Sequence, residues 1–245
     1  MARPTRSDLD LRDRGILARL TQVDAGYDAT DILLGLEFEV RIGEVALVTG
    51  PTAAGKSSFL HLLRLALPPR AGRAIILGAD AARLGARERA TLKRRIGYVA
   101  ENPKFVEEET AFENIALPLK MNGAKAIDYV HDVRELVDFV GLGSAAQLPV
   151  SQLSGAERRR TAIARALANK PELILADDPT AGVSPDAGRR IVRLLAEMRR
   201  VGAGVVIASQ DETLGDVAPC WRWRLEMGRL TPVDQAEHES AEAFE

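Results

Sequence analysis

The segment that most constrains the fold is residues 43–63, "GEVALVTGPTAAGKSSFLHLL", in which an apolar strand pattern leads through a glycine-rich turn into a helical pattern. The turn fits the spacing G-x-x-x-x-G-K-[ST]. Such a loop wraps backbone N–H groups around phosphates, and the following helix directs its positive N-terminus toward them. A chance glycine-rich turn is the alternative, but the flanking strand and helix are the setting that a phosphate-binding loop requires. The predicted phosphate-binding residues are Gly50, Pro51, Thr52, Ala53, Ala54, Gly55, Lys56, Ser57 and Ser58.

Two adjacent carboxylates end a second apolar strand pattern, in the segment "ELILADDPTA" at residues 172–181. Like charges are kept that close when a cation lies beside them or when one of them does acid–base work. A phosphate-binding loop needs an acid at the end of a neighbouring strand to hold Mg²⁺, together with the loop hydroxyl. We therefore predict that Ser57 and Asp177 hold Mg²⁺. Lys56 would reach the β- and γ-phosphates, and Asp178 would polarise the attacking water.

Composition limits the class of protein. The 245 residues are enough for one large α/β domain or two small ones, and 46% hydrophobic and 28% charged residues are ordinary for a soluble globular chain. The net charge of −2 gives no reason to expect nucleic-acid binding. Cys220 is the only cysteine, so no disulfide forms within the chain, and the first residues do not resemble a signal peptide. No apolar run approaches membrane-spanning length, so we expect membrane contact only through a partner.

Strand and helix patterns alternate along most of the chain, which favours a mostly parallel sheet. The alternation of Leu36, Phe38, Val40 and Ile42 with charged residues predicts a half-buried strand, and the pattern around Gly228 predicts a closing hairpin. Helices are predicted at 56–67, 127–140, 155–168 and 187–201, and strands at "GEVALVTG", "AIILG", "IGYVA", "ELILAD" and "GVVIAS". We expect a poorly ordered extension at 1–15, a single domain at 16–233 with a helical part at about 105–169, and a solvated acidic tail at 234–245.

A third motif lies in "QLSGAERRRTAIARALANKPELILADDPT", between the loop and the paired acids. Its segment Leu153 to Glu157, "LSGAE", resembles the signature of ABC-type ATPases, and the resemblance covers about residues 20–230. It implies an α/β fold of the P-loop NTPase (ABC ATPase) class, with a RecA-like parallel-sheet core, an antiparallel β subdomain and a helical subdomain. An N-capping serine on an ordinary helix would explain Ser154 alone, but not the set of three motifs.

The resemblance also implies cofactors and an assembly. In ABC-type ATPases two chains enclose two ATP molecules, so we expect ATP, Mg²⁺ and an ATP-dependent homodimer. Ser154, Gly155 and Ala156 would receive the γ-phosphate bound to the opposite subunit, at the positive end of a helix. Tyr27 lies where these proteins stack an aromatic side chain on adenine, and a plain surface aromatic is the alternative. Residues 110–123 resemble the segment that receives the membrane partner, although some of their apolar side chains belong to the core.

Within the ABC-type ATPases, "LPLKMNG", "VGL" and "ARALANKPELILADDPT" most resemble the FtsE family of cell-division ATP-binding subunits. This resemblance implies an FtsX-like integral membrane partner, a location on the cytoplasmic face of the bacterial inner membrane, and control of peptidoglycan hydrolysis. The lipoprotein-release and macrolide-export ATPases have nearly the same sequence frame, so both stay open as alternatives.

Four positions depart from the family pattern. Asp178 replaces the usual catalytic Glu, Gln210 the switch His, Glu101 the Q-loop Gln, and Ser184 the D-loop Asp. Asp178 is one methylene shorter than Glu, and a misplacement of about an ångström can cost roughly a hundredfold in rate. Gln210 can donate to a phosphate but takes up no proton. Glu101 keeps an oxygen for Mg²⁺ or its water, yet adds negative charge near the triphosphate.

These departures leave two classes of function open. The chain is either a slow ATPase that serves a membrane partner, which we favour, or an ATP-binding dimerisation switch with little turnover. A soluble ABC protein that acts on DNA or ribosomes is a third class. Proteins of that class usually carry two nucleotide domains or long insertions, and this chain has neither.

Overall fold

The structure is a computed structural model, and it describes residues 15–28 and 30–233. The predicted acidic tail and all but the last residue of the predicted N-terminal extension lie outside the described residues. The strands are β1 (Ile16–Tyr27), β2 (Thr30–Arg41), β3 (Val45–Thr49), β4 (Ala71–Ile76), β5 (Ala79–Asp80), β6 (Ile96–Val99), β7 (Leu173–Asp177), β8 (Gly204–Ser209), β9 (Trp221–Glu226) and β10 (Arg229–Pro232). The α-helices are α2 (Lys56–Leu63), α3 (Ala86–Lys93), α4 (Ala111–Met121), α5 (Ala126–Phe139), α6 (Gly155–Leu167) and α7 (Pro185–Glu197).

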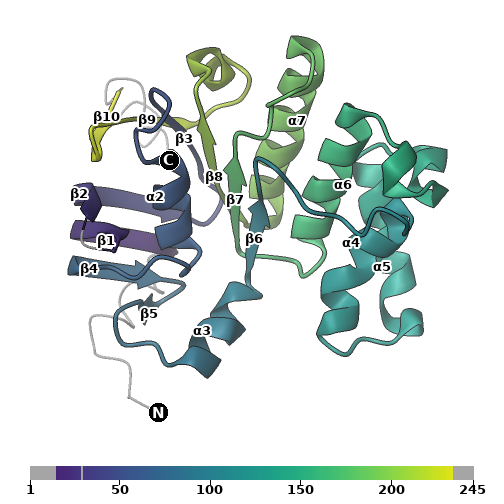
Figure 1. The fold of residues 1–245 in the computed structure, drawn as a ribbon, viewed down its shortest axis with the longest axis horizontal. Helices are drawn as coiled ribbons and strands as arrows, with labels where there is room; N and C mark the ends of the chain where they lie inside the picture. The colour runs from purple at the N-terminus through teal and green to yellow at the C-terminus, as the bar shows by residue number, and fades with distance from the viewer. Residues whose placement is uncertain (1–14, 29, 234–245) are drawn as a thin grey trace, which may run out of the picture.

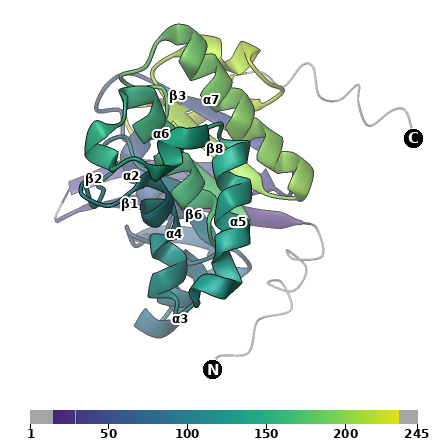
Figure 2. The same ribbon diagram turned by 90° about the vertical axis from the view of Figure 1, so that its right-hand side faces the viewer.

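The strands of the described residues form two sheets. One is antiparallel, in the order β2-β1-β4-β5, and the other has the order β10-β9-β3-β8-β7-β6. In the second sheet β9, β3, β8, β7 and β6 run parallel, and β10 closes it as an antiparallel hairpin with β9. Figure 1 shows the antiparallel sheet on one side, α4, α5 and α6 on the other, and the parallel strands between them. Figure 2 shows α4, α5 and α6 together on the face turned to the viewer.

The parallel strands are continuous apolar runs because both faces of their sheet are covered. Successive side chains of a strand point to opposite faces. Leu173 and Leu175 of β7 accordingly belong to a core with α2 and the antiparallel sheet, whereas Ile174 and Ala176 belong to a core with α4 to α7. Every side chain of β7 is therefore buried, including the carboxylate that ends the strand.

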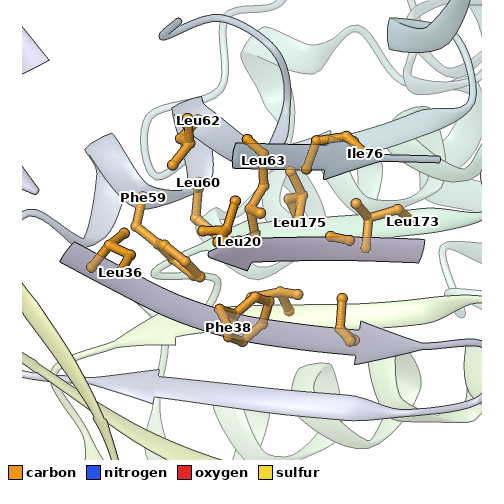
Figure 3. Packing of buried hydrophobic residues seen from close by; sticks show 14 of the residues in the cluster. Leu20, Leu36, Phe38, Phe59, Leu60, Leu62, Leu63, Ile76, Leu173 and Leu175 are labelled. Atoms are coloured by element: carbon orange, nitrogen blue, oxygen red, sulfur yellow. The ribbon is translucent and has the colours of Figure 1, made fainter. Parts of the chain in front are cut away.

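Helix α2 is fixed by the first of these cores. Its residues Phe59, Leu60, Leu62 and Leu63 have no exposed surface, and burying a side chain of this size stabilises the fold by about 1.5–3 kcal/mol. The ring of Phe59 meets that of Phe38 edge to face, with 5.0 Å between centroids. Figure 3 shows these side chains packed against strands of both sheets. This packing sets the position of the N-terminus of α2, where the predicted loop ends.

The mostly parallel sheet, the closing hairpin and the four expected helices are confirmed, with corrections at their ends. Helix α2 ends at Leu63 rather than at residue 67, because Leu65 adopts a left-handed φ of 61° and Pro68 disfavours helical backbone at Leu67. Helix α7 begins two residues early, at Pro185, because Ser184 caps it, and its predicted last turn, Met198–Val201, is a 3-10 helix. The prediction for Ile42 is wrong: β2 ends before it, and its side chain is 55% exposed.

Candidate functional site

The candidate site lies where parallel strands end, which is where ligands bind in open α/β sheets. The loop follows β3, the paired carboxylates end β7, and Gln210 follows β8. Glu101 comes two residues after β6, the strand beside β7. These segments enclose one cavity of about 520 Å³. Its lining residues are Ile32, Thr52, Ala53, Gly55, Lys56, Ser57, Ser58, Glu101, Asp177, Asp178 and Gln210.

Two glycines give the loop its shape. A Cβ at Gly50 would lie 2.0 Å from the carbonyl oxygen of Leu225 in β9, so only glycine allows this close approach. Gly55 precedes α2 with a φ of 104°, a left-handed conformation that other residues rarely adopt. Lys56 Nζ then donates to the carbonyl oxygens of Gly50 at 2.7 Å and Pro51 at 2.8 Å. The loop and the lysine thus lie around the same space.

The cavity holds more acid than base. Glu101, Asp177 and Asp178 line it, and Lys56 is the one cation among its described lining residues. Burial lowers the pKa of Lys56, and the three nearby carboxylates, Asp178 first, partly oppose this. An anion such as a polyphosphate therefore needs an accompanying cation to enter here.

Asp177 is held in place at the end of β7. Its side chain is buried, and each of its oxygens accepts one hydrogen bond. Ser57 Oγ donates to Oδ1 at 3.2 Å, and the hydroxyl of Tyr98 on β6 donates to Oδ2 at 3.1 Å. A serine hydroxyl and a carboxylate are the oxygen ligands that Mg²⁺ prefers, with waters and phosphates completing its coordination. The donor set therefore fits Mg²⁺, and no cluster of three or more His, Cys, Asp or Glu offers an alternative metal cage in the described part of the chain.

Asp178 occupies a constrained position directly after β7. Its backbone has a left-handed φ of 38°, a region that Asp tolerates better than most residues. Its N–H donates to the carbonyl oxygen of Ala208 at 2.8 Å, and Ser209 Oγ donates to its Oδ1 at 3.4 Å. Gln210, one residue further, accepts a hydrogen bond from Thr52 Oγ1 to its Oε1 at 3.0 Å. The ends of β7 and β8 are thereby joined to each other and to the loop.

The segment Ser154–Ala156 lies apart from this cavity, at the start of α6. Ser154 forms a reciprocal capping box with Glu157: its Oγ accepts from the Glu157 N–H at 3.4 Å, while the Glu157 carboxylate accepts from the Ser154 N–H at 2.9 Å. Ala156 lines a different cavity of about 160 Å³. Ser154, Gly155 and Ala156 are therefore not among the described residues that line the cavity beside the loop.

The ABC transporter family matches residues 33–181 of the chain, a span that contains the loop, the "LSGAE" segment and both carboxylates.

The chain belongs to the ABC transporter family of ATP-binding proteins.

Curated relatives include several ABC ATP-binding proteins. An uncharacterized ABC transporter ATP-binding protein of Thermotoga maritima is 34% identical over 86% of this chain and 91% of its own length. The cell division ATP-binding protein FtsE of Escherichia coli K12 is 38% identical over 81% of this chain and 90% of its own. The lipoprotein-releasing system ATP-binding protein LolD of Colwellia psychrerythraea is 36% identical over 83% and 80%.

Solved ABC cassettes share the fold. A dimeric ATP-binding cassette in a post-hydrolysis state, bound to ADP and Pi, superposes with a TM-score of 0.79 at 26% identity. It covers 89% of this chain and 100% of its own. The expected ABC ATPase fold is confirmed. No helix in residues 15–28 and 30–233 of this ABC protein is both long and apolar enough to cross a membrane.

Most of the predicted nucleotide site of this ABC protein comes together, and three groups lie outside its cavity. Gly50, Pro51 and Ala54 are not among the lining residues, although the first two accept hydrogen bonds from Lys56. Tyr27, at the end of β1, is 43% exposed and bonds through its hydroxyl to His61 Nδ1 at 2.9 Å. Its stacking on adenine stays a prediction, as do the roles of the signature residues and the division into subdomains.

Two side chains of this ABC protein contact the site although no role was predicted for them from the sequence. Tyr98 donates to Asp177, and its pKa is raised to about 12 by burial and by the Asp177 carboxylate, so the phenol remains a donor. Arg159 of α6 is buried and donates to the carbonyl oxygens of Ala100, Glu101 and Ala181 at 3.0–3.1 Å. The run "RRR" at 158–160 was a visible signal for Arg159. Nothing in the local sequence marked Tyr98.

Proposed function

We propose that this chain is the ATP-binding subunit of an FtsEX-like complex, which couples ATP binding and slow hydrolysis to a membrane partner. One observation supports this most strongly. The cavity combines an unaltered set for phosphate and metal, Lys56, Ser57 and Asp177, with Asp178, Gln210 and Glu101 at the positions that would serve hydrolysis. We call residues 50–58 with Asp177 the cradle, and Glu101, Asp178 and Gln210 the rim.

The cradle would bind Mg-ATP. The loop N–H groups and Lys56 would hold the phosphates, Ser57 and Asp177 would hold Mg²⁺, and Glu101 would hold the metal or one of its waters. When bound, the ion neutralises charge on the phosphates. It would also offset the excess of carboxylates in this cavity, so we expect nucleotide binding to depend strongly on Mg²⁺. Tyr27 would stack on the adenine.

The rim would make hydrolysis slow. Asp178 Oδ1 is tied to Ser209, and its carboxylate is one methylene closer to the backbone than that of Glu, which carries it away from the attacking water. With Gln210 Oε1 accepting from Thr52, its Nε2 is the atom that would donate to the γ-phosphate. Because Gln cannot take up a proton, Gln210 would orient the phosphate without acting as a base.

Dimerisation would complete the site. Ser154, Gly155 and Ala156 lie outside the cavity of their own chain, where they could receive the γ-phosphate held by a second copy. The dimeric solved cassette with this fold supports the pairing of two chains. The FtsE relative supports a role in cell division. By its resemblance to that family, the chain would bind an FtsX-like integral membrane protein at residues 110–123 and would lie peripherally on the cytoplasmic face of the bacterial inner membrane. Through that partner the chain would control peptidoglycan hydrolases.

Two alternatives follow from specific observations. Three altered rim residues in one cavity would also suit an ATP-dependent dimerisation switch with negligible hydrolysis. The LolD relative, nearly as similar as FtsE, would suit the ATPase subunit of a lipoprotein-release or macrolide-type exporter. Neither alternative changes the role of the cradle.

The test has two parts. Purified protein is titrated with ATP in Mg²⁺, and its steady-state ATP hydrolysis is measured beside Gln210→His and Asp178→Glu. We expect saturable binding, slow turnover and faster turnover in the variants. If neither wild type nor the variants hydrolyse ATP, the result would support the dimerisation switch. If the chain does not bind ATP at millimolar concentration, both the slow ATPase and the switch are contradicted. Co-purification from membranes then identifies the partner: a division-site protein supports the proposal, and a transporter subunit supports the exporter.

A further inference from the structure

A line of hydrogen-bonding side chains runs behind the cradle, from Tyr27 to Asp177. Tyr27 and His61 Nδ1 are 2.9 Å apart, His61 Nε2 and the Tyr98 hydroxyl are 3.5 Å apart, and the Tyr98 hydroxyl lies 3.1 Å from Asp177 Oδ2. The four residues come from β1, α2, β6 and β7. None of these contacts follows from the family motifs, which assign a role to Tyr27 and to Asp177 but not to the residues between them.

The chemistry of the line is consistent in one direction. Tyr98 donates to Asp177, because an ionised carboxylate only accepts. The Tyr98 oxygen can then accept from His61 Nε2–H, which leaves Nδ1 unprotonated and able to accept from the Tyr27 hydroxyl. A single neutral tautomer of His61 therefore satisfies all three contacts.

Packing holds the middle of the line in place. The Tyr98 side chain is half-buried on β6, and the Arg64 guanidinium lies 4.1 Å from its ring centroid. The ring centroids of His61 and Tyr98 are 6.0 Å apart, and the two ring planes are inclined at 60°. Ser57 donates to the other oxygen of Asp177, so the carboxylate accepts one hydrogen bond from α2 and one from β6.

We propose that Tyr98 is a positioning residue that orients Asp177 for the metal, and that His61 and Tyr27 couple this orientation to the adenine side of the site. The proposal rests on the proposed function, since it concerns how this chain binds Mg²⁺ and nucleotide together. Partners that orient metal ligands are typically worth 10–100-fold in metal affinity. A base stacked on Tyr27 would fix one end of the line, and a metal on Asp177 would fix the other, so each would favour the other.

The test measures binding rather than hydrolysis. Adenylyl imidodiphosphate is titrated calorimetrically into the full chain, once with Mg²⁺ and once with EDTA, and the ratio of the two dissociation constants gives the benefit of the metal. We expect Tyr98→Phe to reduce this ratio about tenfold. Tyr27→Phe keeps the ring for stacking but loses the bond to His61, and we expect it to reduce the ratio roughly two- to threefold, the weak end of the range for one neutral hydrogen bond. Tyr129→Phe, on α5 and away from the line, is the matched control.

The outcomes separate this proposal from the function on which it rests. If wild type binds no nucleotide, the proposed function fails. If wild type shows a metal benefit that Tyr98→Phe and Tyr27→Phe both retain in full, the function stands and the positioning line is refuted. The line is also refuted if the folded Tyr98→Phe variant loses affinity equally with Mg²⁺ and with EDTA. Because Tyr27 is at the surface, its variant stays informative even if Tyr98→Phe does not fold.

Discussion

The rim and most of the cradle line one cavity, yet the two sets differ in how closely they follow the ABC pattern. The cradle keeps each expected residue, and its side chains are tied to one another: Lys56 to the loop carbonyls, and Ser57 to Asp177. The rim differs from the pattern at each of its three positions, and its bonds run to strand ends and to Thr52. Under the proposed function, nucleotide binding and hydrolysis would use separate residues, so that binding could be retained while hydrolysis is weakened.

The largest effect is expected from a substitution that removes Lys56, the cation of the cradle. Lys56→Ala is expected to weaken ATP binding at least about 100-fold, because Lys56 would donate to both the β- and the γ-phosphate, hydrogen bonds to charged groups contribute about 1.5–3 kcal/mol each, and about 1.4 kcal/mol is tenfold. Calorimetric titration with Mg-ATP measures this, with Lys120→Ala on α4 as the control. An unchanged affinity in Lys56→Ala would show that the cradle is not the binding site.

The next largest effect is expected from a substitution that restores the usual Glu at position 178 of the rim. Asp178→Glu is expected to raise the steady-state rate of ATP hydrolysis by about 10-fold or more, since it moves the carboxylate outward by about an ångström. Its ATP affinity should stay close to that of wild type. Asp138→Glu makes the same change on the exposed face of α5 and should leave both quantities alone. Equal rates in wild type and Asp178→Glu would remove the distinction between cradle and rim.

A third prediction asks whether the cradle needs a second chain. Ser154→Ala is expected to lower the stability of the chain by about 1 kcal/mol through loss of a helix cap, and also to reduce ATP-dependent dimerisation. Thr110→Ala removes an equivalent capping box from α4 and should cost similar stability without changing the dimer. Light scattering with and without Mg-ATP measures the mass. If both variants dimerise equally well, Ser154 has no role beyond its cap.

The smallest effect concerns pH and the residues behind the cradle. Burial, and then the nearby Arg64, lower the pKa of His61 below its ordinary value near 6.5. The unfolded chain therefore binds a proton at His61 more readily than the folded chain does. The free energy of unfolding is accordingly highest above the ordinary His pKa and decreases as the pH falls below it. The melting temperature should fall between pH 7.5 and pH 5.5, and the fall should be larger for wild type than for His61→Gln. The exposed His131→Gln should behave as wild type, and an equal fall in all three would contradict the prediction.

Much of the cradle could be predicted from sequence, because its residues are adjacent in the chain and the strand and helix around them have clear patterns. Strand β1 was missed because bulges near Leu20 and Val23 break the two-residue period that reveals a strand. Helix α3 was missed because Leu92 is its only buried residue, which leaves no apolar stripe to detect.

The contacts of Asp177 could not be predicted for a different reason. Tyr98 lies 79 positions before Asp177, and His61 lies 37 before Tyr98. The pairing of β6 with β7, and the packing of α2 beside β7, bring the three side chains together only in the folded chain. The same holds for Gln210 and Thr52, which are 158 positions apart. The local role of Ser184 is evident only in the structure, where it caps the N-terminus of α7, as an Asp at this position could also do.

The most direct test measures ATP binding and turnover on one sample of wild-type protein. We expect saturable binding of ATP in Mg²⁺ together with turnover well below that of ABC ATPases that carry Glu and His at the positions of Asp178 and Gln210. Rapid turnover would show that the altered rim still catalyses, and absence of binding at millimolar ATP would show that the cradle does not hold a nucleotide.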